Sequence, residues 1–178
     1  MSDVVTAPGI FPNLEPAPPT ALGALSPMSD LSYLVGGVWV ARMASGSGET
    51  VVEEAIRWAI EGSVLVSRQV TRQEGKEPIE GLGLMAWNPQ VARIQMMKIA
   101  TNGMAEGQEA GGVGGPPETV IFLGRSTSAS GTIEWRQGLT QVDGDTMVTT
   151  TAIKEGSGYK PSPPCTFHRR GDSEGAAG

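Results

Sequence analysis

From residue 38 onward, the chain consists of short runs of apolar and β-branched residues separated by turn residues. Within the runs the alternation of polar and apolar side chains is imperfect, as in 53–58, where Glu54 shares a parity with Ile56 and Trp58. Short runs bounded by Gly, Pro, Asn and Asp are typical of β-strands. The pattern predicts an all-β fold with nine such runs, at 38–43, 50–60, 63–71, 79–87, 92–100, 118–125, 132–142, 146–154 and 164–170.

The connections between the runs favour hairpins. Four of them carry tight-turn residues, Glu61-Gly62, Glu74-Gly75-Lys76, Asn88-Pro89-Gln90 and Asp143-Gly144-Asp145. Hairpins join strands that are adjacent in sequence, so we expect an up-and-down antiparallel meander. Closure of such a meander removes its exposed edges, and we therefore predict a β-barrel of about 8–10 strands.

The remaining segments divide the chain into three parts. Residues 1–28 are rich in Pro and lack periodicity, so we expect a tail or arm there, followed by a barrel over 29–170 and a flexible tail over 171–178. Ser29 or Asp30 can cap a short helix over 31–35 that ends at Gly36-Gly37. The glycine-rich segment 103–117 is predicted to be a mobile loop at one mouth of the barrel.

Charge and composition exclude several classes of function. The net charge is −6, with 13 basic and 19 acidic residues, and the chain has no extended basic cluster, so we expect no nucleic-acid partner. No apolar run reaches the roughly 18 residues of a membrane span, so no membrane insertion is expected. The N-terminal residues lack the pattern of a secretory signal, which predicts a cytoplasmic protein. With one histidine and one cysteine, Cys165, we expect no disulfide, metal or cofactor.

Several segments together resemble a known superfamily. They are Gly37-Val38-Trp39, which matches a G-x-W motif, and the segments 53–58, 81–89 and 165–170. On these residues the chain resembles, over about 31–170, the calycin superfamily, in particular a bacterial family of lipocalin-like barrels and, more distantly, nitrobindin. The resemblance implies that Trp39 plugs the closed end of the barrel and that Arg169 or Arg170 lies across its indole in a cation–π contact.

The resemblance also requires that haem be considered. Nitrobindin-like proteins bind haem through a histidine near the last strand, and in this chain that position falls nearer Pro164, which cannot ligate iron. His168 is the only histidine and is predicted to face outward near the basic end of the chain. We therefore expect no haem.

A barrel of this size either fills its centre with side chains or holds one small ligand. Aromatic residues make up only 5% of the chain, whereas adaptable methionines are common in the strands, which favours a partly open interior. We predict that the barrel binds a small hydrophobic molecule and that two copies of the chain could pair as a homodimer. The predicted ligand-binding residues are Trp58, Arg68, Met85, Gln95, Met97, Trp135 and Arg136.

Two alternatives remain open. Glu54 could point inward, with Arg68 or Arg136 as its partner, or outward into solvent. If a carboxylate is enclosed, the protein could instead be a cofactor-independent enzyme of the isomerase, cyclase or lyase type, with Glu54 or Glu134 as general acid and base. A third reading is a scaffold whose barrel is filled and whose outer face serves dimerisation.

Overall fold

The structure is a computed structural model that describes residues 27–46, 48–60, 63–88, 93–110 and 119–171. Several predictions fall outside these described residues. They are the arm over most of 1–28, the tail over 172–178, and the turns at 61–62 and 89–90.

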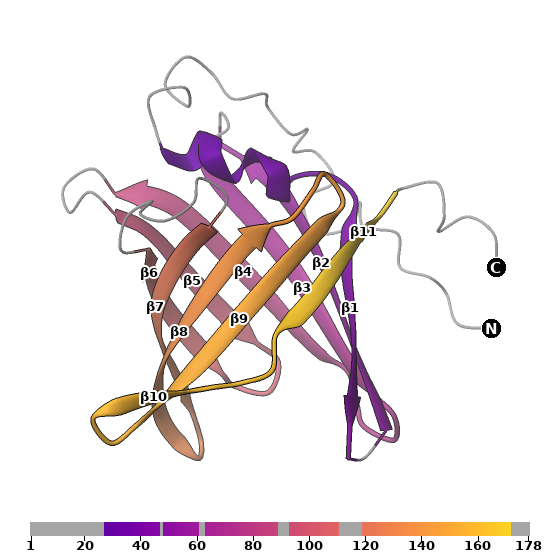
Figure 1. Ribbon diagram of the computed structural model, residues 1–178, viewed down its shortest axis with the longest axis vertical. Helices are drawn as coiled ribbons and strands as arrows, with labels where there is room; N and C mark the ends of the chain where they lie inside the picture. The colour runs from indigo at the N-terminus through magenta and orange to yellow at the C-terminus, as the bar shows by residue number, and fades with distance from the viewer. Residues whose placement is uncertain (1–26, 47, 61–62, 89–92, 111–118, 172–178) are drawn as a thin grey trace.

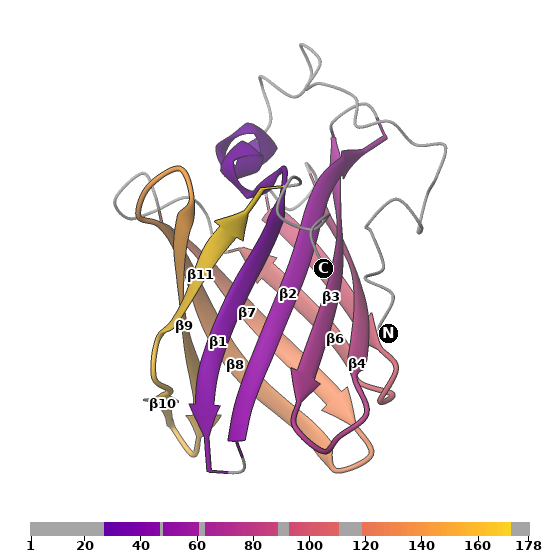
Figure 2. The same cartoon turned by 90° about the vertical axis from the view of Figure 1, so that its right-hand side faces the viewer.

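The strands form a single antiparallel sheet that closes on itself (Figures 1 and 2). Its strands are β1 (Val38–Ser45), β2 (Gly48–Ala59), β3 (Val64–Gln73), β4 (Ile79–Asn88), β5 (Arg93–Ala100), β6 (Ala105–Ala110), β7 (Thr119–Ser128), β8 (Gly131–Gln141), β9 (Thr146–Glu155), β10 (Gly158–Pro161) and β11 (Cys165–Arg170). Neighbours in sequence are neighbours in space from β1 to β9, and β11 pairs with both β9 and β1. Ten strands therefore make a closed ring, which confirms the predicted all-β, up-and-down barrel.

The last strand of the ring is interrupted. Both β10 and β11 pair with β9, but Pro161 lies opposite Ala152 and Cys165 lies opposite Thr149. Between these two pairs, the chain from β10 to β11 has one residue more than the facing part of β9, as in a β-bulge. Pro163 and Pro164 lie in this interval and have no N–H to donate to the ladder, so the strand breaks there. The sequence pattern missed β10 for this reason.

The predicted mobile loop over 103–117 is wrong for its first half. Residues 105–110 form β6, which pairs with β5 on one side and β7 on the other. Its Gly, Ala and Glu residues have low strand propensity, so the local pattern gave no strand signal. Two flanking strands satisfy its backbone groups instead, and Gln108 and Ala110 are buried on its inner side. Residues 111–118 lie outside the described part of the chain.

Two of the predicted turns can be compared with the structure, and both are present. At 74–76, Gly75 has a positive φ of 71° and Lys76 N donates to Gln73 O. At 143–145, the Asp143 side chain accepts a hydrogen bond of 2.9 Å from Asp145 N, an arrangement typical of Asp in turns.

The segment before β1 closes one end of the barrel (Figure 1). The sequence predicted a short helix over 31–35; the segment is a 3-10 helix, η2, with other bounds, Pro27–Leu34. A 3-10 helix has three residues per turn, so Met28, Leu31 and Leu34 lie on one face. All three are almost completely buried. This face seals the apolar core of the barrel.

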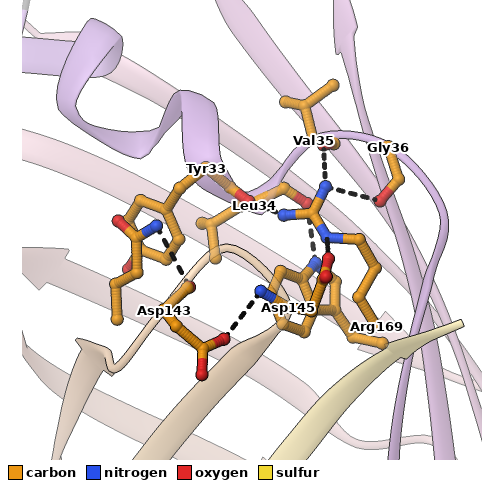
Figure 3. Close-up of polar contacts among 9 residues, drawn as sticks. Tyr33, Leu34, Val35, Gly36, Asp143, Asp145 and Arg169 are labelled. Atoms are coloured by element: carbon orange, nitrogen blue, oxygen red, sulfur yellow. Dashed lines mark hydrogen bonds and ion pairs between the residues drawn. The ribbon is translucent and has the colours of Figure 1, made fainter.

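The polar contacts at this end hold η2 to the first and last strands (Figure 3). Trp39 is fully buried, and its Nε1 donates a hydrogen bond of 2.8 Å to Leu34 O. Arg169 lies over the Trp39 ring, with Cζ 4.5 Å from the centroid, which confirms the expected cation–π contact. Such a contact contributes about 0.5–2 kcal/mol.

The same guanidinium binds the backbone that follows η2. Arg169 donates to the carbonyl oxygens of Tyr33 and Val35, and it forms an ion pair with Asp145 at 3.5 Å. The close approach requires Gly37, which has a φ of 65°, because a Cβ there would lie 2.7 Å from Arg170 O. Arg169 therefore joins η2, the β8–β9 turn and β11 around the indole.

Candidate functional site

The closed sheet encloses a cavity of about 230 Å³. Strands β2, β3, β4, β5, β8, β9 and β11 contribute alternate residues to its wall, β1 contributes Met43, and Leu34 of η2 covers one end. Most of the wall is aliphatic or thioether. The apolar lining residues are Leu34, Met43, Val52, Ile56, Leu65, Met85, Met96, Leu139, Met147 and Phe167.

One side of the cavity carries charge. Glu54 on β2 forms an ion pair with Lys98 on β5, at 3.2 Å between Oε1 and Nζ. The two side chains are only 16% and 14% exposed. Lys98 Nζ also donates to Gln69 Oε1. A charge pair withdrawn from water is stable only when each charge keeps its partner, so these three residues act as one unit.

An unpaired hydroxyl lies beside this unit. Ser67 lines the cavity and is 8% exposed, and among the described residues its Oγ has no hydrogen-bond partner. In the register of β3, β4 and β5, Ser67 pairs with Gly83, and Gly83 pairs with Lys98. Gly83 has no side chain, and the Ser67 hydroxyl lies over it, 2.5 Å from the place that a Cβ would take.

Cys165 also faces the cavity. It is half-buried, and burial raises the pKa of its thiol, although a hydrogen bond with Thr149 acts in the opposite direction. A thiol with a raised pKa is mostly protonated near neutral pH, so it is a poor nucleophile. We therefore assign Cys165 to the wall of the cavity.

A second group of inward polar side chains lies on β6, β7 and β8. Trp135 Nε1 donates to Ser126 Oγ at 2.7 Å, and Ser126 Oγ donates to Glu106 Oε1 at 3.0 Å. Gln108 Nε2 donates to the other oxygen of Glu106 at 3.3 Å. The group holds the Trp135 indole in place.

Only some of the predicted ligand-binding residues face the cavity. Glu54 points inward, which decides between the two orientations that the sequence left open, and Met85 lines the wall beside it. Trp58 and Trp135 are buried on inward-facing positions of β2 and β8, but neither lines this cavity. The predicted partner of Glu54 is wrong, because Lys98 takes the place expected for Arg68 or Arg136.

The other predicted residues lie on the outside of the barrel, which corrects their assignment to its interior. Each has the opposite strand parity from the lining residues, and each contacts outer-face neighbours. Arg68 pairs with Glu80, and Gln95 donates to Glu109. Arg136 lies over the ring of Tyr159, and Met97 is 63% exposed.

Glu134, the second predicted acid/base residue, is also outside. Its carboxylate pairs with Lys154 and with Arg125, at 3.0 Å to the latter. The hydrogen bonds from Lys154 and Arg125 lower the pKa of Glu134. It is therefore a surface carboxylate that stays ionised, and it has no access to the cavity.

The only histidine does not face the interior either. His168 is exposed on β11, between the inward-facing Phe167 and Arg169. Pro164, where the resemblance places the haem-ligand position, is exposed and has no ligating atom in its side chain. The residues present therefore do not fit a histidine-ligated haem. In the described part of the chain, no group of three or more His, Cys, Asp or Glu residues could hold a metal ion.

Sequence reasoning missed Lys98, Ser67, Gln69 and Gly83. One signal was available for the lysine. Lys98 shares its strand parity with Ile94 and Met96, so a charge stands on the apolar side of β5. The serine and the glycine carried no such signal, because both are common in exposed strands and turns.

These features define a class of protein, a closed antiparallel β-barrel with a small internal cavity that is apolar with one polar side. In comparisons with known proteins, neither a family model nor a curated protein matches the sequence. The fold is similar to the crystal structure of Rv2717c from M. tuberculosis, with a TM-score of 0.55 and 16% sequence identity. The similarity covers 80% of this chain and 96% of that chain, and it concerns the fold alone. None of the described helical segments has the length and apolarity needed to cross a membrane.

Proposed function

We propose that the barrel binds a small, mainly apolar molecule in the cavity between η2 and Lys98. The observation that supports this proposal is the enclosed volume of about 230 Å³ with an aliphatic wall and a few convergent polar groups. Pockets for small molecules combine these features. The volume lies below the usual range of about 300–1,000 Å³, which favours a compact guest.

The methionines of the wall suit this role. Met85, Met96 and Met147 come from three different strands, and each has a flexible thioether side chain that adapts to irregular apolar shapes. The cavity can therefore adjust to its guest without movement of the barrel backbone.

The enzymatic alternative receives less support. Glu134 is outside the barrel, and Glu54 is held in an ion pair by Lys98. A general base must be free to accept a proton from the substrate. We therefore limit the proposal to binding.

The homodimer stays a prediction. The exposed apolar residues Leu84, Met97 and Leu123 gather on the outer faces of β4, β5 and β7, where a second copy could pack. Sedimentation equilibrium of the intact chain would test the homodimer prediction, and a monomer at all concentrations would contradict it.

The binding proposal can be tested with α-methylstyrene, a compact hydrocarbon, and protein labelled at its methionine methyl groups. We expect saturable NMR shifts of the Met85, Met96 and Met147 methyl signals, because these groups line the cavity. The Met97 signal should not move, since that side chain lies on the outer face.

A pair of variants provides the matched control. Met85→Trp adds bulk inside the cavity and should abolish binding, whereas Met97→Trp makes the same change outside and should leave binding unchanged. Circular dichroism would confirm that both variants are folded. Shifts confined to Met97, or no saturable shifts at all, would contradict an internal site.

A further inference from the structure

We infer that the guest of the cavity is a neutral molecule with one acceptor oxygen, of the carbonyl type, which is bound by the hydroxyl of Ser67 beside Lys98. The inference rests on the proposed binding function and adds the chemical class of the guest. Its basis is the arrangement of donors and charges on one side of the cavity.

The first observation is the unsatisfied hydroxyl of Ser67. Ser67 is more than nine-tenths buried, and its Oγ has no partner among the described residues although it lines the cavity. Buried polar side chains in folded proteins nearly always have a hydrogen-bond partner, and an unmade bond is unfavourable. A guest that brings an oxygen to this hydroxyl would remove the deficit.

The second observation is the position of that hydroxyl beside Lys98. A Cβ atom added to Gly83 would lie 2.5 Å from Ser67 Oγ and 3.7 Å from Lys98 Cε, so the hydroxyl itself lies over the glycine and close to the lysine side chain. All three residues line the cavity. A guest oxygen that reaches Ser67 Oγ is therefore also near the Lys98 side chain.

The third observation is that both neighbours can donate. An ammonium group has three N–H bonds, and Lys98 uses them on two partners, Glu54 and Gln69. The Ser67 hydroxyl can also donate. A carbonyl oxygen has two lone pairs, so it can accept one hydrogen bond from each side chain.

The charges beside this hydroxyl decide against an anionic guest. The charge of Lys98 is balanced by Glu54 at 3.2 Å. A carboxylate guest would therefore find no unbalanced positive charge here, whereas a neutral carbonyl needs no counter-charge.

Three probes of nearly the same shape separate these possibilities. Acetophenone has the carbonyl, α-methylstyrene replaces its oxygen with a methylene group, and benzoate has a carboxylate. Dissociation constants would be measured from the cavity methionine signals for the full chain and for Ser67→Ala. We expect Ser67→Ala to weaken the binding of acetophenone about three- to tenfold, since one hydrogen bond is lost. The binding of α-methylstyrene should not become weaker.

Thr149→Val is the matched control within the same cavity. It also removes a lining hydroxyl, but Thr149 Oγ1 already donates to Cys165 O at 3.4 Å. The variant should therefore leave acetophenone binding unchanged. Gly83→Ala should weaken acetophenone binding as well, because the methyl group would lie 2.5 Å from Ser67 Oγ and would force the hydroxyl to move.

Each outcome bears on a different claim. If no probe binds inside the barrel, the proposed function itself fails. If acetophenone and α-methylstyrene bind and Ser67→Ala affects them equally, the barrel is a binding protein but the carbonyl assignment is overturned. Tighter binding of benzoate than of acetophenone would overturn the neutral class, and an equal loss in Thr149→Val would remove the special role of Ser67.

Discussion

Gly107 and Gly124 lie on the neighbouring strands β6 and β7, but only one of them has room for a side chain. A Cβ at Gly124 would lie 2.6 Å from Trp135 Cε2, whereas a Cβ at Gly107 would meet nothing within 4 Å. The Trp135 indole therefore packs directly on the backbone of Gly124 and uses its Nε1 to bind Ser126.

We predict that Gly124→Ala destabilises the protein by about 1–3 kcal/mol, because the indole must leave its site and its hydrogen bond to Ser126 breaks. The change in the free energy of unfolding would be measured by urea denaturation. The fluorescence of Trp135 should change in the folded state as well.

Gly107→Ala is the control for the Gly124→Ala variant. The free energy of unfolding should stay the same or rise by up to about 1 kcal/mol, because alanine lowers the entropy of the unfolded chain. Equal destabilisation by the two variants would show that loss of glycine flexibility, and not the contact with Trp135, controls stability.

At the scale of elements, the barrel closes where β11 meets β1, and a carboxylate spans this junction on the outside. Glu53 on β2 binds Arg170 on β11 at 3.0 Å, and it also binds Arg72 on β3. Partial burial raises the pKa of Glu53, but hydrogen bonds and charge from Arg72 and Arg170 outweigh it, so the pKa is lowered. The ionised carboxylate thus ties three strands together.

This lowered pKa predicts how stability depends on pH. The contribution of Glu53 is complete above the pKa of an unfolded glutamate, about 4.3, and is lost as the pH falls through the lower folded pKa. The variant Glu53→Gln should therefore be less stable than the natural chain at pH 7. The difference should shrink towards pH 3, where the carboxylate becomes protonated.

Urea denaturation of both proteins at pH 7 and at pH 3 measures the effect. Glu49→Gln is a suitable control, because Glu49 pairs with Arg42 near the opposite end of the barrel and both side chains are more than half exposed, at 55% and 63%. Such surface pairs contribute little. If the free energies of unfolding of Glu53→Gln and of the natural chain differed by the same amount at pH 7 and at pH 3, the role given to the ionised carboxylate would be contradicted.

At the scale of the whole molecule, β11 completes the ring because it pairs with both β9 and β1. Without β11, β1 would lose one of its two partners, and Trp39 would lose the arginine that covers it. Exposed edges favour pairing with other chains. The closed ring is therefore the unit that should unfold cooperatively.

We predict that a chain ending at Pro161 loses its cooperative unfolding transition and associates. Urea denaturation followed by tryptophan fluorescence, together with size-exclusion chromatography, would show this. A chain ending at Gly171 keeps all described strands and should behave as the full chain does. A monomeric, cooperatively unfolding chain without β11 would mean that closure is not needed for folding.

Much of the fold could be predicted because its signals are local. Turn residues such as Asp143 and Gly75 act within a few positions, and runs of β-branched residues mark strands wherever they pair. β6 was not predicted because its stability comes from pairing with β5 and β7, and no local sequence pattern indicates these neighbours. The contact at the base of the barrel was predicted from the resemblance that the segments around Trp39 and the final arginines carry.

The candidate site could be predicted only in outline. Alternation along a strand separates its residues into two faces, but it does not say which face is inside. Met97 and Arg68 were assigned inward, and the structure places both outside. Met85 lies inside as expected. Glu54, whose orientation the sequence left open, also lies inside, while its partner on a distant strand was missed.

The amino-acid sequence by itself determined that this chain forms strands joined by hairpins, because these features depend on neighbouring residues. The contact of an indole with an arginine at one end was expected from a resemblance to a known superfamily. The tertiary structure alone decided which parity faces inward and that Lys98 meets Glu54. It also decided that the Ser67 hydroxyl lies over Gly83. These relations arise when the sheet curves and closes, which brings together residues from β2, β3, β4 and β5 through backbone pairing.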